Sequence, residues 1–400
     1  MNPLVPRPVE IALRCVIAVV CLLGIWYSWR LARADYLFRK DTESSIRAAI
    51  RLVPDGWEYY MRLSQIDRRD ARDLLATSLR LDRFNAQADI ELGLKYEADG
   101  DIGGAERLLL DAYSVDHTYL PRWTLANFYY RQDNMPAFWN WARSAAAMPP
   151  GDLMPLFQLC WHVSTDTNTI TGELMNDNPD MIRQYLYFLL TKGQRDATIV
   201  VAQRLINTGG TEMDHRLVLW TINELITNNN PPAANTLWSL LQQRHWVVPD
   251  STVPYNADFA REPVPVSFDW ALPEFDGLHS FPGASGLEVE FSGAQPEDVK
   301  VAEQVISLTP GNYNLVYSYR TTDIGTESGI KWVVLDARSN AVLAQSPDLS
   351  SDTVTESNLA FTVPAGASFV RLRLAYQRAL GTSRIAGTLV VPSVRVQPHS

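Results

Sequence analysis

Hydrophobic residues follow three different patterns along the 400-residue chain. From Ile11 to Trp29 they are nearly continuous, which predicts one membrane-crossing helix. Over residues 41–245 they recur at helical spacing, whereas over 266–398 they alternate in short runs typical of strands. Residues 246–265 carry spaced prolines and predict a linker. We therefore expect a multidomain chain with a single transmembrane helix, an all-α region and an all-β antiparallel sandwich.

The apolar segment 11–29 has the length of a bilayer crossing. As a helix its nineteen residues span about 28 Å, close to the hydrocarbon thickness. Aromatic rings that favour the headgroup interface cluster at its end, at Trp26, Tyr27 and Trp29. Residues 1–10 form a short tail before it. Two alternatives stay open: a signal peptide cleaved after Ala34, because Ala32-Arg33-Ala34 has the small-x-small form, or a buried soluble helix.

Basic residues flank this segment on both sides. Arg7 and Arg14 lie at its start, and the other side carries Arg30, Arg33, Arg39 and Lys40. Because the positive-inside rule is then nearly balanced, topology depends on the character of the C-terminal region. We expect a single-pass protein of the bacterial inner membrane with its bulk in the periplasm.

Similar residues in the helical region recur 34 positions apart. The pairs are Ala71 and Ala105, Leu75 and Leu109, Asp82 and Asp116, Leu92 and Ala126, Tyr96 and Tyr130, and Ala112 and Ala146. This period indicates stacked helical hairpins, each of which buries its apolar stripe against its neighbours. We expect Gly93 to let two helices approach closely and Gly100 to supply the turn between them.

At Leu92-Gly93, Tyr96, Ala105, Leu109 and Ala112 the chain resembles the tetratricopeptide repeat (TPR) family. The resemblance covers residues 54–148 and extends to 245 by architecture, with further hairpins expected at 179–191 with 195–208 and at 212–228 with 232–244. It implies a TPR-like solenoid that binds protein partners, with the first helix of each hairpin on the concave face. The candidates for partner binding are Asn127, Tyr130 and Arg131, and the alternative for Tyr130 is core packing.

The C-terminal region predicts seven or eight short strands in ~130 residues, typical of an antiparallel sandwich. Leu287, Val289 and Phe291 share one face of their strand, and the odd-numbered residues from Tyr313 to Tyr319 share one face of another. The runs 305–315, which contains Pro310-Gly311-Asn312-Tyr313, and 384–394 resemble galactose-binding-like jelly rolls. Many members of that fold are carbohydrate-binding modules, so the resemblance implies a glycan ligand.

Sugar recognition requires aromatic rings that stack on sugar faces and planar polar groups that bind hydroxyls. The candidates in this region are Arg320, Trp332, Arg371 and Arg373. We expect Arg320 to lie opposite the Tyr313–Tyr319 row, with the other three on neighbouring strands of one polar surface. The alternative is a solvated sheet face with Trp332 buried.

Charge and motifs exclude several function classes. Six basic and two acidic residues stand in the first forty, so the net charge of −10 leaves −14 for residues 41–400, which argues against nucleic acid. The six histidines and three cysteines show no metal-binding spacing, and phosphate-binding or nucleophile motifs are missing. We expect no catalytic residues, no metal and no cofactor. A glycosidase is the remaining enzymatic alternative, since carboxylate pairs such as Glu288 and Glu290 occur.

These patterns favour a non-enzymatic, membrane-anchored scaffold. It would bind protein partners of the envelope machinery through its TPR-like repeats and glycan through its sandwich, in the assembly or export of a surface polysaccharide. The alternative function is a structural assembly factor of another envelope complex, with a sandwich that binds protein.

Overall fold

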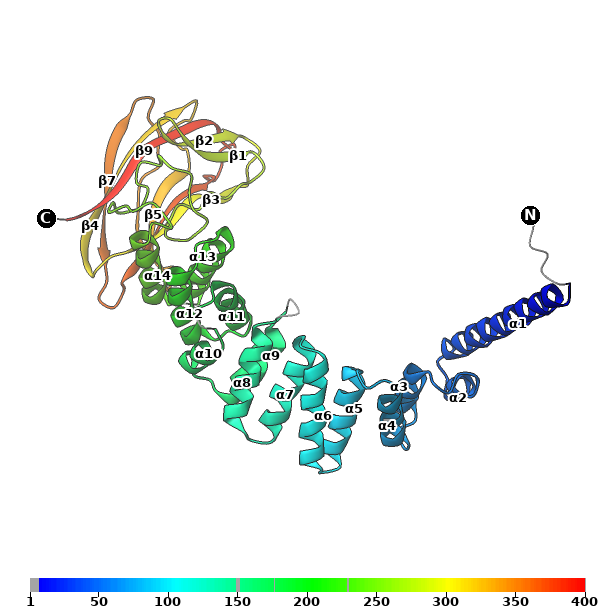
Figure 1. The fold of residues 1–400 in the computed structure, drawn as a ribbon. Coiled ribbons are helices and arrows are strands. Elements are labelled where there is room, and N and C mark those ends of the chain that lie inside the picture. Colours follow the sequence, from blue (N-terminus) through cyan, green and yellow to red (C-terminus); the bar gives the residue numbers. More distant parts are fainter. Residues whose placement is uncertain (1–6, 149–151, 176, 229, 400) are drawn as a thin grey trace, which may run out of the picture. The chain divides into compact units, whose positions relative to one another are not determined.

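The computed structural model describes residues 7–148, 152–175, 177–228 and 230–399. Fourteen helices precede nine strands in this part of the chain (Figure 1). The expected order, a helical region followed by an antiparallel sandwich, is confirmed. The chain forms two compact units: one ends at Thr165 and takes in Gly172–Met175, and the other holds Asp166–Thr171 and the chain after Met175. The second unit therefore contains four of the helices together with the whole sandwich.

Helix α1 (Arg7–Phe38) contains the apolar segment. The most apolar 18-residue stretch within Ile11–Phe38 has a mean hydropathy of 2.1 and is not buried against the protein. Among the described residues it is the one helix long and apolar enough to cross a membrane. Residues 1–6 of the expected tail lie outside the described part, and residues 7–10 belong to α1.

The last turns of α1 pack against α2 (Glu43–Leu52) and α3 (Trp57–Ile66). Ala34 is fully buried in the cluster that these helices share, and Arg30 Nε donates to the Leu52 carbonyl. The same helix thus carries the apolar segment and forms one side of the first hairpin. Cleavage after Ala34 would remove most of α1 from this hairpin.

The other helices of the first unit pack mainly in consecutive pairs. The pairs are α3 with α4 (Ala71–Leu81), α5 (Ala86–Ala98) with α6 (Ile102–Val115), and α7 (Tyr119–Arg131) with α8 (Met135–Ala146), followed by α9 (Met154–Val163). The residues of α10 (Thr167–Leu174) are divided between the two units. In the second unit α11 (Pro179–Thr191) pairs with α12 (Arg195–Thr208), and α13 (Glu212–Thr227) with α14 (Pro231–Gln243).

The α5–α6 hairpin shows why the repeat needs small residues. A Cβ at Gly93 would lie 3.0 Å from Leu109 Cδ2 and 3.4 Å from the Ala105 carbonyl oxygen. The close approach expected at Gly93 is therefore confirmed. Gly100 makes the turn with a φ of +85°, which a residue with a side chain rarely adopts. Asp101 then caps α6 by accepting a hydrogen bond from the Gly104 amide.

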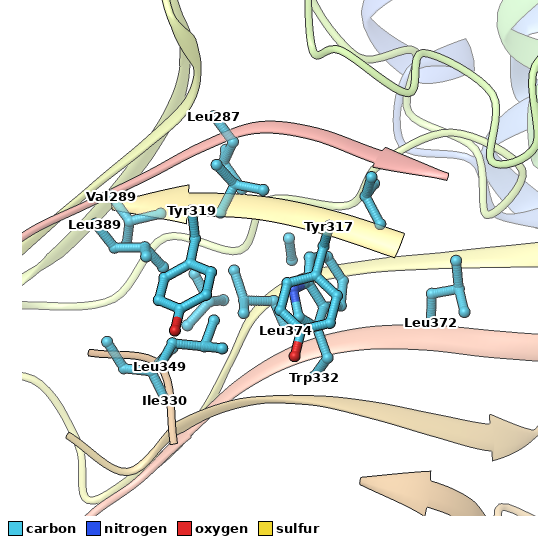
Figure 2. Close-up of a cluster of buried hydrophobic side chains, with 14 of the residues drawn as sticks. Leu287, Val289, Tyr317, Tyr319, Ile330, Trp332, Leu349, Leu372, Leu374 and Leu389 are labelled. Atoms are coloured by element: carbon cyan, nitrogen blue, oxygen red, sulfur yellow. The ribbon is translucent and has the colours of Figure 1, made fainter. Parts of the chain in front are cut away.

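The sandwich consists of two antiparallel sheets (Figure 1). The five-stranded sheet has the order β1 (Leu278–Gly283), β2 (Gly286–Ser292), β9 (Ala386–Pro398), β4 (Gly311–Thr322) and β7 (Thr355–Val363). The four-stranded sheet has the order β3 (Asp298–Ser307), β8 (Phe369–Gln377), β5 (Ile330–Asp336) and β6 (Val342–Gln345). The core between them includes Leu287, Val289, Tyr317, Trp332 and Leu374 (Figure 2), so the expected inward rows of β2 and β4 are confirmed.

Residues 246–277 contain no helix or named strand, yet they pack closely within the second unit. The backbone amide of Val394 donates to the Ala257 carbonyl, and the buried Gln304 side chain donates to Tyr255 and Phe268 carbonyls. The Phe268 ring lies 6.0 Å from that of Trp238 in α14. The proline-containing segment therefore joins the last helical hairpin to the sandwich through buried contacts.

Candidate binding surfaces

The three residues expected to bind protein partners all lie on α7. The Asn127 side chain donates to the Trp123 carbonyl within the helix at 2.8 Å. The half-buried ring of Tyr130 lies 6.1 Å from that of Phe138, a packing contact with α8. Arg131 donates to both carboxylate oxygens of Glu97, at 2.8 and 2.7 Å. Each residue thus has a partner inside the array, and a role in partner binding stays a prediction.

The contact between Arg131 and Glu97 joins equivalent positions of neighbouring hairpins, 34 residues apart. A similar link in the second unit connects α11 and α13, where Arg183 Nε lies 2.5 Å from the fully buried Asp214 carboxylate. Burial opposes ionisation of Asp214, but hydrogen bonds from Arg183 and from the Gly210 and Thr211 amides prevail and lower its pKa to about 2. These arginines fix the stacking of successive hairpins.

An exposed aromatic pair marks the helices of the second unit. Tyr187 on α11 and Trp220 on α13 are 49% and 40% exposed, and their ring centroids are 6.0 Å apart. They occupy equivalent positions in successive hairpins, and Met213, 60% exposed, lies two turns before Trp220. Sequence reasoning missed this pair, although an aromatic residue repeated at nearly the array period was a usable signal. Exposed aromatic rings of this kind are enriched at protein interfaces.

The four residues expected to bind glycan do not form one surface. Arg320 belongs to β4 in the five-stranded sheet, whereas Arg371 and Arg373 belong to β8 in the four-stranded sheet. All three arginines point away from the core, so they lie on opposite outer faces of the sandwich. Trp332 is 0% exposed within the core (Figure 2), so its ring cannot stack on a sugar. The predicted common surface and the stacking role of Trp332 are both wrong.

The outer face of the five-stranded sheet collects a different set around Arg320. Strand pairing places Phe281, Glu288, Val390 and Arg320 in one row across β1, β2, β9 and β4. The next row contains His279 and Glu290. The Phe281 ring is 38% exposed. An accessible ring beside carboxylates, an imidazole and a guanidinium supplies both elements of sugar recognition.

A cleft of about 550 Å³ lies between α13, α14 and the segment after α14. The His215 ring stacks on Trp246 with centroids 4.2 Å apart, and Leu219 contributes to an apolar lining. Burial raises the pKa of Asp269 to about 6, although hydrogen bonds from the Val264 and Trp270 amides lower it in part. Polar groups converging on an apolar floor suit the binding of a small molecule.

No three or more His, Cys, Asp or Glu side chains are grouped to hold a metal ion in the described part of the chain. Cys160 is fully buried, and burial raises the pKa of its thiol, which keeps it protonated.

No family model and no curated protein matches this chain. Among solved structures it is similar to one described as "CBM4 structure and function", with 15% identity and a TM-score of 0.30 over 36% of this chain and 99% of that one. It is also similar to PilF of Pseudomonas aeruginosa, with 13% identity and a TM-score of 0.25 over 54% and 90% of the two chains. PilW, described as a widely conserved type IV pilus biogenesis factor, gives 12% identity and a TM-score of 0.27 over 54% and 92%.

Proposed function

We propose that this protein is a non-enzymatic, membrane-anchored scaffold that binds glycan through its sandwich and protein partners through its helical hairpins. The observation that carries the proposal is the row across the five-stranded sheet, in which the exposed Phe281 ring and the Arg320 guanidinium share one face. A sheet face with one exposed ring and several planar polar groups suits an extended sugar chain better than a reaction that requires an enclosed site.

The helical half of the proposal is supported by the exposed pair Tyr187 and Trp220. Equivalent positions of stacked hairpins form a continuous stripe, which can follow an extended or helical partner. Protein partners of the envelope machinery would therefore bind along this stripe. A second candidate surface, in the first unit, consists of Asn127, Tyr130 and Arg131.

The cellular setting belongs to the proposal as well. The apolar part of α1 would anchor the chain in the bacterial inner membrane with its bulk in the periplasm, where surface polysaccharides are assembled or exported. The uninterrupted passage of α1 into the first hairpin would hold the array next to the membrane.

A glycan-binding experiment tests the proposal. The full chain in lipid nanodiscs is screened on an array of bacterial glycans, and the affinity of the best ligand is compared for Phe281→Ala and Arg320→Ala. Each substitution should weaken binding about tenfold, because stacking and charge-assisted hydrogen bonds are each lost. Phe84→Ala, which removes an exposed ring from the first unit, is the control. If no glycan on the array binds the chain, the proposal that the sandwich binds glycan is overturned.

A second candidate function is a structural assembly factor whose sandwich binds protein. Leu380, 98% exposed between β8 and β9, favours it, because an apolar tip of this kind suits a protein contact. The glycan array would then show no ligand, while a photo-crosslinker at position 380 would capture one defined protein.

A further inference from the structure

The outer face of the four-stranded sheet is basic, although the chain as a whole carries a net charge of −10. Lys300 on β3 and Lys331 on β5 both pair with Ala375 on β8, so the two lysines flank that small residue on one face. Arg373 and Arg371 follow on the same face of β8. Four cations thus occupy three adjacent strands.

One carboxylate, that of Glu303, lies within 4.0 Å of three of these cations. Glu303, directly opposite Arg373, has its Oε2 2.6 Å from Arg373 Nε and its Oε1 3.6 Å from Arg371 Nε. Lys300 Nζ lies 3.7 Å from the same Oε1. Asp298 on β3 lies on the same face, opposite Gln377, so four cations and two carboxylates leave this face with a net charge of +2. The ion pairs order the two guanidinium groups before any ligand arrives, which reduces the entropy lost on binding.

The arrangement of this face indicates the chemistry of its ligand. Lys300 and Lys331 are separated by two strand spacings, about 10 Å, with only the methyl group of Ala375 between them. An extended chain could lie across this low floor and bring successive anionic groups to the cations. Guanidinium groups favour carboxylates, which they can bind with two parallel hydrogen bonds. Asn340, whose Oδ1 accepts from Arg371, and Gln377 at the end of β8 offer amide groups for hydroxyls.

We propose that this face binds an acidic polysaccharide, a chain of uronic acid units. The inference rests on the proposed function, because it takes the sandwich to be a glycan-binding module, and it adds a second face with its own ligand class. The opposite outer face carries Glu288, Glu290 and Glu356 against Arg320 and Arg395, so it does not attract a polyanion. The two faces of the sandwich would therefore select differently charged glycans.

The experiment measures binding of polygalacturonate, with dextran as a neutral glycan, to the full chain in phosphatidylcholine nanodiscs. The double variant K300Q/K331Q should weaken polygalacturonate binding at least about tenfold and flatten its dependence on salt, since two ionic contacts are lost. The variant K192Q/R244Q removes the same charge from exposed positions directly after α11 and α14 in the same unit and should leave binding within about twofold.

Equal affinities of K300Q/K331Q and the parent chain for polygalacturonate would overturn the inference. It would also be overturned if the face bound vesicles containing phosphatidylglycerol more tightly than polygalacturonate, because the ligand would then be a membrane surface. A neutral glycan that binds through Phe281 and Arg320, without any binding of polygalacturonate, would leave the proposed function intact and reject this second face alone. Failure of both glycan classes would reject both.

Discussion

Asp89 is a buried carboxyl group whose ionisation costs stability. It lies on α5 with 6% of its surface exposed, and burial, together with the nearby Asp111 carboxylate, raises its pKa to about 6. The folded chain therefore holds this proton more tightly than the unfolded chain. Stability from this group is fully present below about pH 4 and is lost as the pH rises through 6.

Asp89→Asn should accordingly raise the free energy of unfolding by about 1–3 kcal/mol at pH 7.5 and have little effect at pH 4. Urea unfolding followed by circular dichroism at the two pH values measures the difference. Asp73→Asn, which removes an exposed carboxyl from α4, controls for the change in net charge. An equal effect of Asp89→Asn at both pH values would contradict the assignment.

At the scale of elements, the α5–α6 hairpin depends on close contact at Gly93. Gly93→Val should lower the free energy of unfolding of the first unit by about 1–3 kcal/mol, because its side chain would overlap Leu109. Gly103→Ala on α6 is the matched control: a Cβ there meets nothing within 4 Å, so a gain of about 0.5–1 kcal/mol is expected. Thermal unfolding of both variants measures the two effects, and a neutral Gly93→Val would argue against tight packing.

Local patterns predicted the elements well but not their pairing. The expected hairpin 179–191 with 195–208 coincides with α11 and α12, because helical spacing and turn residues are local signals. Which sheet a strand joins depends on pairing between strands distant in the sequence. No local pattern therefore shows that Arg320 and Arg371 belong to different sheets. Trp332 lies in the nearly continuous apolar run Lys331–Leu335, where alternation does not indicate which side faces the core.

At the scale of the whole molecule, we expect one membrane crossing and an exported body. A fusion of alkaline phosphatase after residue 400 should be active in bacterial cells, whereas a fusion of a fluorescent protein that folds only in the cytoplasm should stay dark. The reverse pattern would place the sandwich in the cytoplasm and remove the setting proposed for its glycan ligands.

We propose that one chain holds protein and glycan at separate surfaces. The most direct measurement captures the chain on beads coated with its glycan ligand, after a photo-crosslinker at position 187 has labelled its partner in cells. We predict that the labelled partner is retained with the parent chain, and that Phe281→Ala retains less of the chain and of the partner in the same proportion. Trp220→Ala should keep the chain on the beads but lose the partner. Loss of glycan binding in Trp220→Ala, or retention of the partner in that variant, would contradict the claim.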